Sequence, residues 1–112
     1  GNMVRSKSEM MIDSSLYIHK IPFRYEDTLA LDDIILYPDF TIRHPKTGEY
    51  FYWEHFGLMD DPVYCKNTFS KLQLYTTNNI VPDINLITTY ETRERPLSME
   101  KIERIITEHF IE

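Results

Sequence analysis

The arrangement of apolar and polar residues along the chain predicts three helices. The first covers residues 4–20 and ends before Pro22, because proline disfavours helix in the residue that precedes it. The second has Asp61 as its N-cap and Pro62 at its first helical position, and it runs to position 77. The third follows Ser98. Its apolar stripe consists of Ile102, Ile105, Ile106 and Phe110.

Three strand-like stretches lie between the first two helices, and all are rich in β-branched and aromatic residues. They cover residues 23–31, 34–43 and 50–57. Asp32-Asp33 predicts the first turn between them, and residues 44–49 predict the second. A fourth strand is expected at 84–90. The order αβββαβα, an antiparallel meander followed by a helical crossover, predicts an α/β domain with helices flanking a mixed sheet.

Composition restricts the class of protein. With 112 residues, 42% of them hydrophobic and 27% charged, the chain has room for one folded domain over residues 1–112. It contains neither an apolar run of membrane-spanning length nor a secretory pattern, so no membrane partner is expected. The single Cys65 cannot form an internal disulfide, which favours a cytoplasmic protein. Gly1 and Asn2 fit either a cloning remnant or the edge of a domain cut from a longer protein.

Two acidic residues, Asp39 and Glu54, lie in predicted strands among large apolar neighbours, where strand propensity disfavours them. A turn centred on Lys46 and Thr47 would set Asp39 directly opposite Glu54. Two carboxylates that close repel each other unless a proton or a cation lies between them, and oxygen ligands of this kind suit Mg²⁺. The alternative is a pair of unrelated strand acids that face solvent.

A third acid, Glu9, lies in the first predicted helix, three residues after Ser6. The pattern Ser-x-x-Glu is typical of a capping box, in which the two side chains satisfy free backbone N–H groups at a helix N-terminus. On the sequence alone, this capping role is the preferred interpretation of Glu9.

The formal net charge of −6 argues against a protein that binds nucleic acid through a basic surface. The objection is weaker for a protein whose carboxylates hold divalent cations, because bound metal neutralises them.

Tyrosines are also frequent in the predicted strands. Those at positions 25, 37, 50 and 52 are interpreted as strand formers rather than base-stacking platforms, and Trp53 as a core residue.

An ordered set of short motifs resembles the PD-(D/E)XK nuclease superfamily, which has the restriction-endonuclease-like fold. The motifs are VRSKSE at 4–9, YE at 25–26, YPDFTI at 37–42, WEHFG at 53–57, MDDPxY at 59–64 and KLxxY at 71–75. In content and order they are similar to an uncharacterised bacterial branch of that superfamily, and they span nearly the whole chain. The resemblance implies an αβββαβ(α) mixed sheet flanked by helices.

The resemblance also implies roles for individual residues. Asp39 and Glu54 would hold a catalytic metal, Mg²⁺ with Mn²⁺ as a substitute, and the backbone carbonyl of His55 would complete the ligand set. Glu9 would join through water or a second metal, which shifts the balance away from a purely capping role. The side chain of His55 is a weaker candidate for a general base, because strand alternation puts it on the face opposite Glu54.

The sequence departs from the superfamily pattern at Phe56, where a lysine would be expected two residues after the second acid. Related families carry this lysine on the following helix, and Lys71 lies at a fitting position, on one helical face with Asn67 and Tyr75. Lys7, near Glu9, is the other candidate. Either lysine could instead be a solvated surface residue.

These observations predict a Mg²⁺-dependent phosphodiesterase, an endo- or exodeoxyribonuclease acting on DNA. The competing hypothesis is a catalytically degenerate domain of the same nuclease-like fold that binds nucleic acid or protein. The absent motif lysine and the acidic charge favour this second hypothesis, whereas the presence of Glu9, Asp39 and Glu54 together favours the enzyme. A homodimer and further domains of a longer chain stay open as partners.

Overall fold

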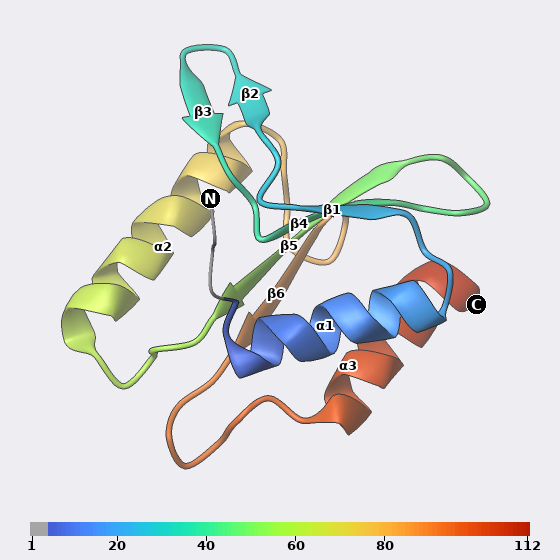
Figure 1. Cartoon of the computed structure of the whole chain (residues 1–112). Coiled ribbons are helices and arrows are strands. Elements are labelled where there is room, and N and C mark those ends of the chain that lie inside the picture. The colour runs from blue at the N-terminus through green and yellow to red at the C-terminus, as the bar shows by residue number, and fades with distance from the viewer. Residues whose placement is uncertain (1–4) are drawn as a thin grey trace.

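The computed structural model describes residues 5–112, and Figure 1 shows how their elements are arranged. The helices are α1 (Lys7–Ile18), α2 (Pro62–Thr77) and α3 (Met99–Ile106), and α3 continues into the π-helical turn η1 (Thr107–Ile111). The strands are β1 (Phe23–Tyr25), β2 (Leu29–Leu31), β3 (Ile34–Leu36), β4 (Phe40–Arg43), β5 (Tyr50–Phe56) and β6 (Leu86–Tyr90).

Four of these strands form a mixed sheet in the order β1-β4-β5-β6. The pairs β1–β4 and β4–β5 are antiparallel, and α2 carries the chain across so that β6 pairs with β5 in parallel. The strands β2 and β3 form a separate two-stranded hairpin. Helices α1 and α3 lie on one side of the sheet and α2 on the other (Figure 1). The expected α/β class, with helices flanking a mixed sheet, is therefore confirmed.

The prediction that residues 23–31 and 34–43 each form one continuous strand is wrong. The first stretch breaks after Tyr25, because Glu26 adopts a left-handed backbone conformation with φ 50°. The second breaks between Leu36 and Phe40, around a proline that cannot donate a ladder hydrogen bond. Each predicted strand therefore contributes one segment to the sheet and one to the β2–β3 hairpin.

The helix boundaries largely agree with the predictions. Ser6 is the N-cap of α1, so the helix begins later than predicted, and Val4 lies outside the described residues. The N-cap Asp61 accepts hydrogen bonds from the N–H groups of Val63 and Tyr64. Ser98 caps α3 through the N–H of Lys101. The fourth strand starts two residues later than predicted.

Two apolar clusters fill the space on either side of the sheet. The larger lies between the sheet and α1, α3 and η1, and includes Ile12, Leu16, Phe40, Trp53, Ile102, Ile106 and Phe110. The smaller lies under α2 and consists of Tyr75, Ile80 and Leu86, with apolar side chains of the β2–β3 hairpin packed against it. Trp53 is fully buried, as expected. Within residues 5–112, no helix has the length and apolar character needed to cross a membrane.

Candidate active site

The register of β4 and β5 brings Asp39 and Glu54 together. Phe40 pairs with Trp53, so Asp39, the residue before β4, lies opposite Glu54. Consistent with this, the N–H of Asp39 donates to Oε1 of Glu54 at 3.3 Å. Both acids line one pocket of about 230 Å³ on the α2 side of the sheet. The expectation that they share a face is confirmed, although Asp39 precedes its strand rather than lying within it.

Glu54 is almost completely buried, with 1% of its surface exposed. A buried carboxylate needs compensating donors, because burial without them costs several kcal/mol. The hydroxyl of Tyr75 donates to Oε2 of Glu54 at 2.8 Å, and the Lys71 ammonium forms an ion pair with the same oxygen. Burial and the neighbouring Glu54 raise the pKa of Tyr75, so its hydroxyl stays protonated as a donor.

Asp39 is held by the backbone of the neighbouring strand. Its Oδ2 accepts the N–H of His55 at 2.7 Å. Burial, and then repulsion from Glu54, raise the pKa of Asp39 to about 7, although the His55 hydrogen bond and the charge of Lys71 act in the opposite direction. An aspartate with such a pKa carries an unfavourable charge at neutral pH, which a nearby cation would relieve.

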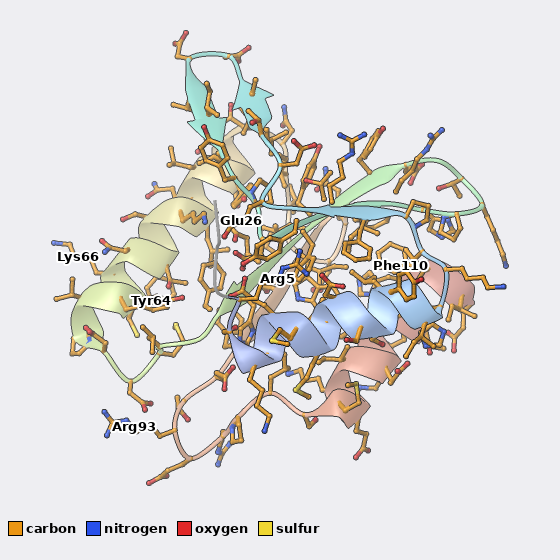
Figure 2. The ribbon with its side chains drawn as sticks, in the orientation of Figure 1. Arg5, Glu26, Tyr64, Lys66, Arg93 and Phe110 are labelled. Carbon is orange, nitrogen blue, oxygen red and sulfur yellow. The ribbon has the colours of Figure 1, made fainter. Side chains whose placement is uncertain are left out.

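A second group of acids adjoins Asp39. Oxygen atoms of Glu9, Glu26 and Asp39 all lie within 4.8 Å of one another. Glu26 is a site residue that the sequence reasoning did not assign, and Figure 2 shows it between the β2–β3 hairpin and α1. The signal lay in the register, since Tyr25 pairs with Phe40 and the next residue therefore lies beside Asp39. Four acids thus converge from α1, β5 and the ends of β1 and β4.

Glu9 makes the expected capping contact and also lies beside the other acids, whereas its role at a metal stays a prediction. The hydroxyl of Ser6 accepts the N–H of Glu9 at 3.1 Å and donates to its Oε1 at 3.0 Å, which is the capping interaction. The other oxygen, Oε2, accepts the hydroxyl of Tyr25 at 2.5 Å. The Arg5 guanidinium lies 4.0 Å from the centre of the Tyr25 ring. Capping therefore orients Glu9 towards the other acids.

The two candidate lysines are placed differently. Lys71 reaches from α2 into the pocket, where it contacts Glu54 and shares the lining with Asn67. Lys7 is exposed on the first turn of α1. At the position of the superfamily lysine, Phe56 is buried and stacks on Tyr90, with ring centres 5.5 Å apart. Phe56 thus makes an apolar contact there, and Lys71 brings the only lysine ammonium among the pocket's described lining residues.

The side chain of His55 points away from Glu54, as strand alternation predicts. Its Nδ1 lies 2.8 Å from the hydroxyl of Thr89, and its Nε2 lies 2.6 Å from Oε1 of Glu91. Partial burial would raise the pKa of the Glu91 carboxyl, but hydrogen bonds from Ser8 and His55 outweigh it and lower that pKa. Both ring nitrogens are therefore engaged behind the sheet, and His55 offers only its backbone to the pocket.

Comparisons with protein-family models, with curated proteins and with solved structures find no match for this chain. The interpretation of the pocket therefore depends on its own chemistry. It combines closely spaced carboxylates, a lysine held by one of them and a fixed backbone N–H beside the other. This combination is suited to binding a cation and an anion side by side.

Proposed function

We propose that this chain is a metal-dependent nuclease that hydrolyses phosphodiester bonds in nucleic acid, with DNA as the expected substrate. The observation that carries the proposal is the meeting of Asp39, Glu54 and Lys71 in one pocket. We further propose that the order of α1, three antiparallel sheet strands, α2 and a parallel fourth strand is the restriction-endonuclease-like topology.

The residues present fit a divalent cation. The oxygens of Glu9, Glu26 and Asp39 lie within 4.8 Å of one another, and hard oxygen donors of this kind suit Mg²⁺ or Mn²⁺. Glu54 adds a fourth carboxylate beside Asp39. When bound, the metal would polarise the scissile phosphate and lower the pKa of an attacking water.

The remaining groups act on the metal ligands and on the phosphate. The N–H of His55 holds the Asp39 carboxylate in one orientation, and the Tyr75 hydroxyl does the same for Glu54. The Lys71 ammonium, paired with Glu54 in the free protein, would move to a phosphate oxygen of the substrate. There it would offset the charge that develops in the transition state.

A second candidate function, a nuclease-like domain that binds without cleaving, is favoured by one specific observation. Both oxygens of Glu54 already accept hydrogen bonds within the protein, from Asp39 and Tyr75, and Lys71 neutralises its charge. A site that has exchanged its metal for an internal ion pair would show this arrangement. A metal bound by Glu54 would compete with this ion pair.

Cleavage of labelled DNA separates the two candidates. Single-stranded, duplex and branched substrates are incubated with Mg²⁺ or Mn²⁺, and products are resolved by length. The enzyme is expected to cut at least one substrate, only with metal present, and Asp39→Ala is expected to abolish the cut. Metal-independent cleavage, or equal activity of Asp39→Ala, would assign the activity to a contaminant and contradict the proposal.

A further inference from the structure

The acids occupy one row of side chains across the sheet, and the rows that follow on the same face have a different character. Pairing of Tyr25 with Phe40 and of Phe40 with Trp53 places Glu26, Asp39 and Glu54 side by side. Two residues further along each strand, about 7 Å away, the next row brings Arg24 beside Thr41. In the row after that, Arg43 pairs with Tyr50.

We call the surface formed by Arg24, Thr41, Arg43 and Tyr50 the open sheet face. In Figure 1 the β4–β5 hairpin extends beyond α2 and the β2–β3 hairpin, and no helix of residues 5–112 lies over its upper side. All four residues line one hollow of about 320 Å³. A second hollow of about 380 Å³ adjoins it, shares Arg43 and is lined by Lys46.

The charge of this surface differs from that of the chain. The two hollows together are lined by the cations Arg24, Arg43 and Lys46 and by one acid, Asp27, which lies 3.8 Å from Arg24. The chain as a whole carries a formal net charge of −6. This local excess of cations lies next to the row of carboxylates on an otherwise acidic protein. It is complementary to a polyanion whose scissile phosphate is bound at that row.

Aromatic and polar groups accompany the arginines. Tyr50 is 55% exposed although it lies in a strand, so its ring is available to a ligand. The hydroxyl of Thr41 is buried without a hydrogen-bond partner among the described residues. Cations beside an exposed ring are typical of surfaces that bind single-stranded nucleic acid, where phosphates contact arginine and bases stack on aromatic rings.

We propose that the open sheet face binds a single-stranded segment of nucleic acid that flanks the bond to be cut. Arg24 and Arg43 contact its phosphates, and a base stacks on Tyr50. That this segment flanks the bond to be cut, and that the strand runs from the acid row towards the β4–β5 turn, rests on the proposed nuclease function. The binding itself does not.

The test measures binding in the absence of cleavage. A fluorescein-labelled oligonucleotide of about ten nucleotides is titrated with Asp39→Asn protein in Mg²⁺ buffer, and anisotropy is followed at several salt concentrations. Introducing both Arg24→Ala and Arg43→Ala into the Asp39→Asn protein is expected to weaken oligonucleotide binding at least ten-fold. The slope of log affinity against log salt is expected to fall by about 1.4, the value for two lost phosphate contacts on a single strand. Tyr50→Ala is expected to weaken binding about ten-fold with the slope unchanged.

The matched control removes the same charge elsewhere. Lys101→Ala combined with Arg104→Ala changes two exposed cations on α3, on the other side of the sheet, and is expected to leave affinity within about two-fold. Equal weakening by both double variants would show a general charge effect and overturn the proposal. Tighter binding of a duplex of the same length, with the same dependence on Arg24 and Arg43, would overturn the single-strand assignment.

Failure of this proposal and failure of the nuclease proposal are separable. If the Arg24 and Arg43 variants cleave DNA as the wild type does and bind the oligonucleotide with unchanged affinity, the proposal for the open sheet face fails and the nuclease proposal stands. If binding depends on the open sheet face but no metal condition gives cleavage, the nuclease proposal fails and the binding proposal stands. If the protein binds no oligonucleotide and forms a dimer that Tyr50→Ala dissociates, the open sheet face is a self-association surface and the proposal is overturned.

Discussion

Lys71 forms an ion pair with Glu54, the most deeply buried carboxylate of the pocket. The two residues come from different layers, since Lys71 lies on the helix that covers the sheet and Glu54 lies within a central strand. The pair therefore joins α2 to β5 at the point where the acids converge. Substitution of Lys71 therefore tests both catalysis and stability.

We predict that Lys71→Ala reduces turnover by about 10²–10³-fold, the effect of removing one preorganised electrostatic contact. Lys71→Arg should recover little of this loss, because a planar guanidinium does not reproduce a compact ammonium charge. Lys66→Ala is the control, since Lys66 is exposed and points away from the sheet (Figure 2). Single-turnover rates on a DNA substrate measure the effect. Full activity of Lys71→Ala would leave Lys71 with a structural role only.

The same variant should also lower stability. Removing Lys71 leaves Glu54 as a buried and partly uncompensated charge, although about a third of the lysine side chain is exposed and water moderates the loss. We expect the free energy of unfolding of metal-free Lys71→Ala to fall by about 1–3 kcal/mol in urea titrations. Kinetics should therefore be compared at a temperature at which both proteins are folded. A loss as small as that of Lys66→Ala would show that the ion pair contributes nothing to the fold.

Divalent metal should stabilise the folded protein, because the unfolded chain cannot bring Glu9, Glu26 and Asp39 together. Thermal melts in millimolar Mg²⁺ or Mn²⁺ are expected to rise relative to melts in EDTA. Asp39→Asn should remove the rise. A melting temperature that stays constant across a wide metal titration would support the binding module that does not cleave.

Without metal, Asp39→Asn should make the protein more stable in alkaline buffer. Burial and Glu54 raise the pKa of Asp39 from 3.8 to about 7, so the stability that protonated Asp39 contributes is complete below about pH 4 and lost as pH rises through 7. Asparagine carries no charge and can still accept the His55 N–H. At pH 8 we expect a gain of about 1–3 kcal/mol in the free energy of unfolding, and little change at pH 4. A gain of equal size at both pH values would point to a cause other than this charge.

Glu26→Gln tests the acid that sequence reasoning did not assign. If Glu26 contributes an oxygen to the metal site, the variant should need at least ten-fold more Mn²⁺ for half-maximal thermal stabilisation. Asp27→Asn is the matched control, because it removes the same charge from the next residue, which lies outside the three-carboxylate group. Equal metal titrations for both variants would exclude Glu26 from the site.

The parts of the site that could be predicted depend on short-range geometry. Strand pairing across one turn set Asp39 against Glu54, and helical spacing put Lys71 on one face with Asn67 and Tyr75, although only the family resemblance suggested that this face meets the acids. The position of the His55 side chain followed from alternation alone. Each of these inferences needs only one element or one hairpin.

Glu26 was missed because its position depends both on the register of β1 with β4 and on where the chain leaves the sheet. The break after Tyr25 occurs at a non-glycine residue with a positive φ, and neither glycine nor proline marks it in the sequence. The second break had a signal, since Pro38 is unsuited to the interior of a central strand. Recognising that break would have separated β3 from β4, but not β1 from β2.

The row of acids also limits how the length of this chain can vary. A single residue inserted within β4 or β5 would turn either Asp39 or Glu54 to the α1 side, because successive strand residues face opposite ways. Insertions in the β2–β3 hairpin or in the turn at 44–49 would leave the row intact. Among homologous chains, we expect insertions and deletions to gather at those two loops, while the spacing from Asp39 to the end of β4 and from the start of β5 to Glu54 stays constant.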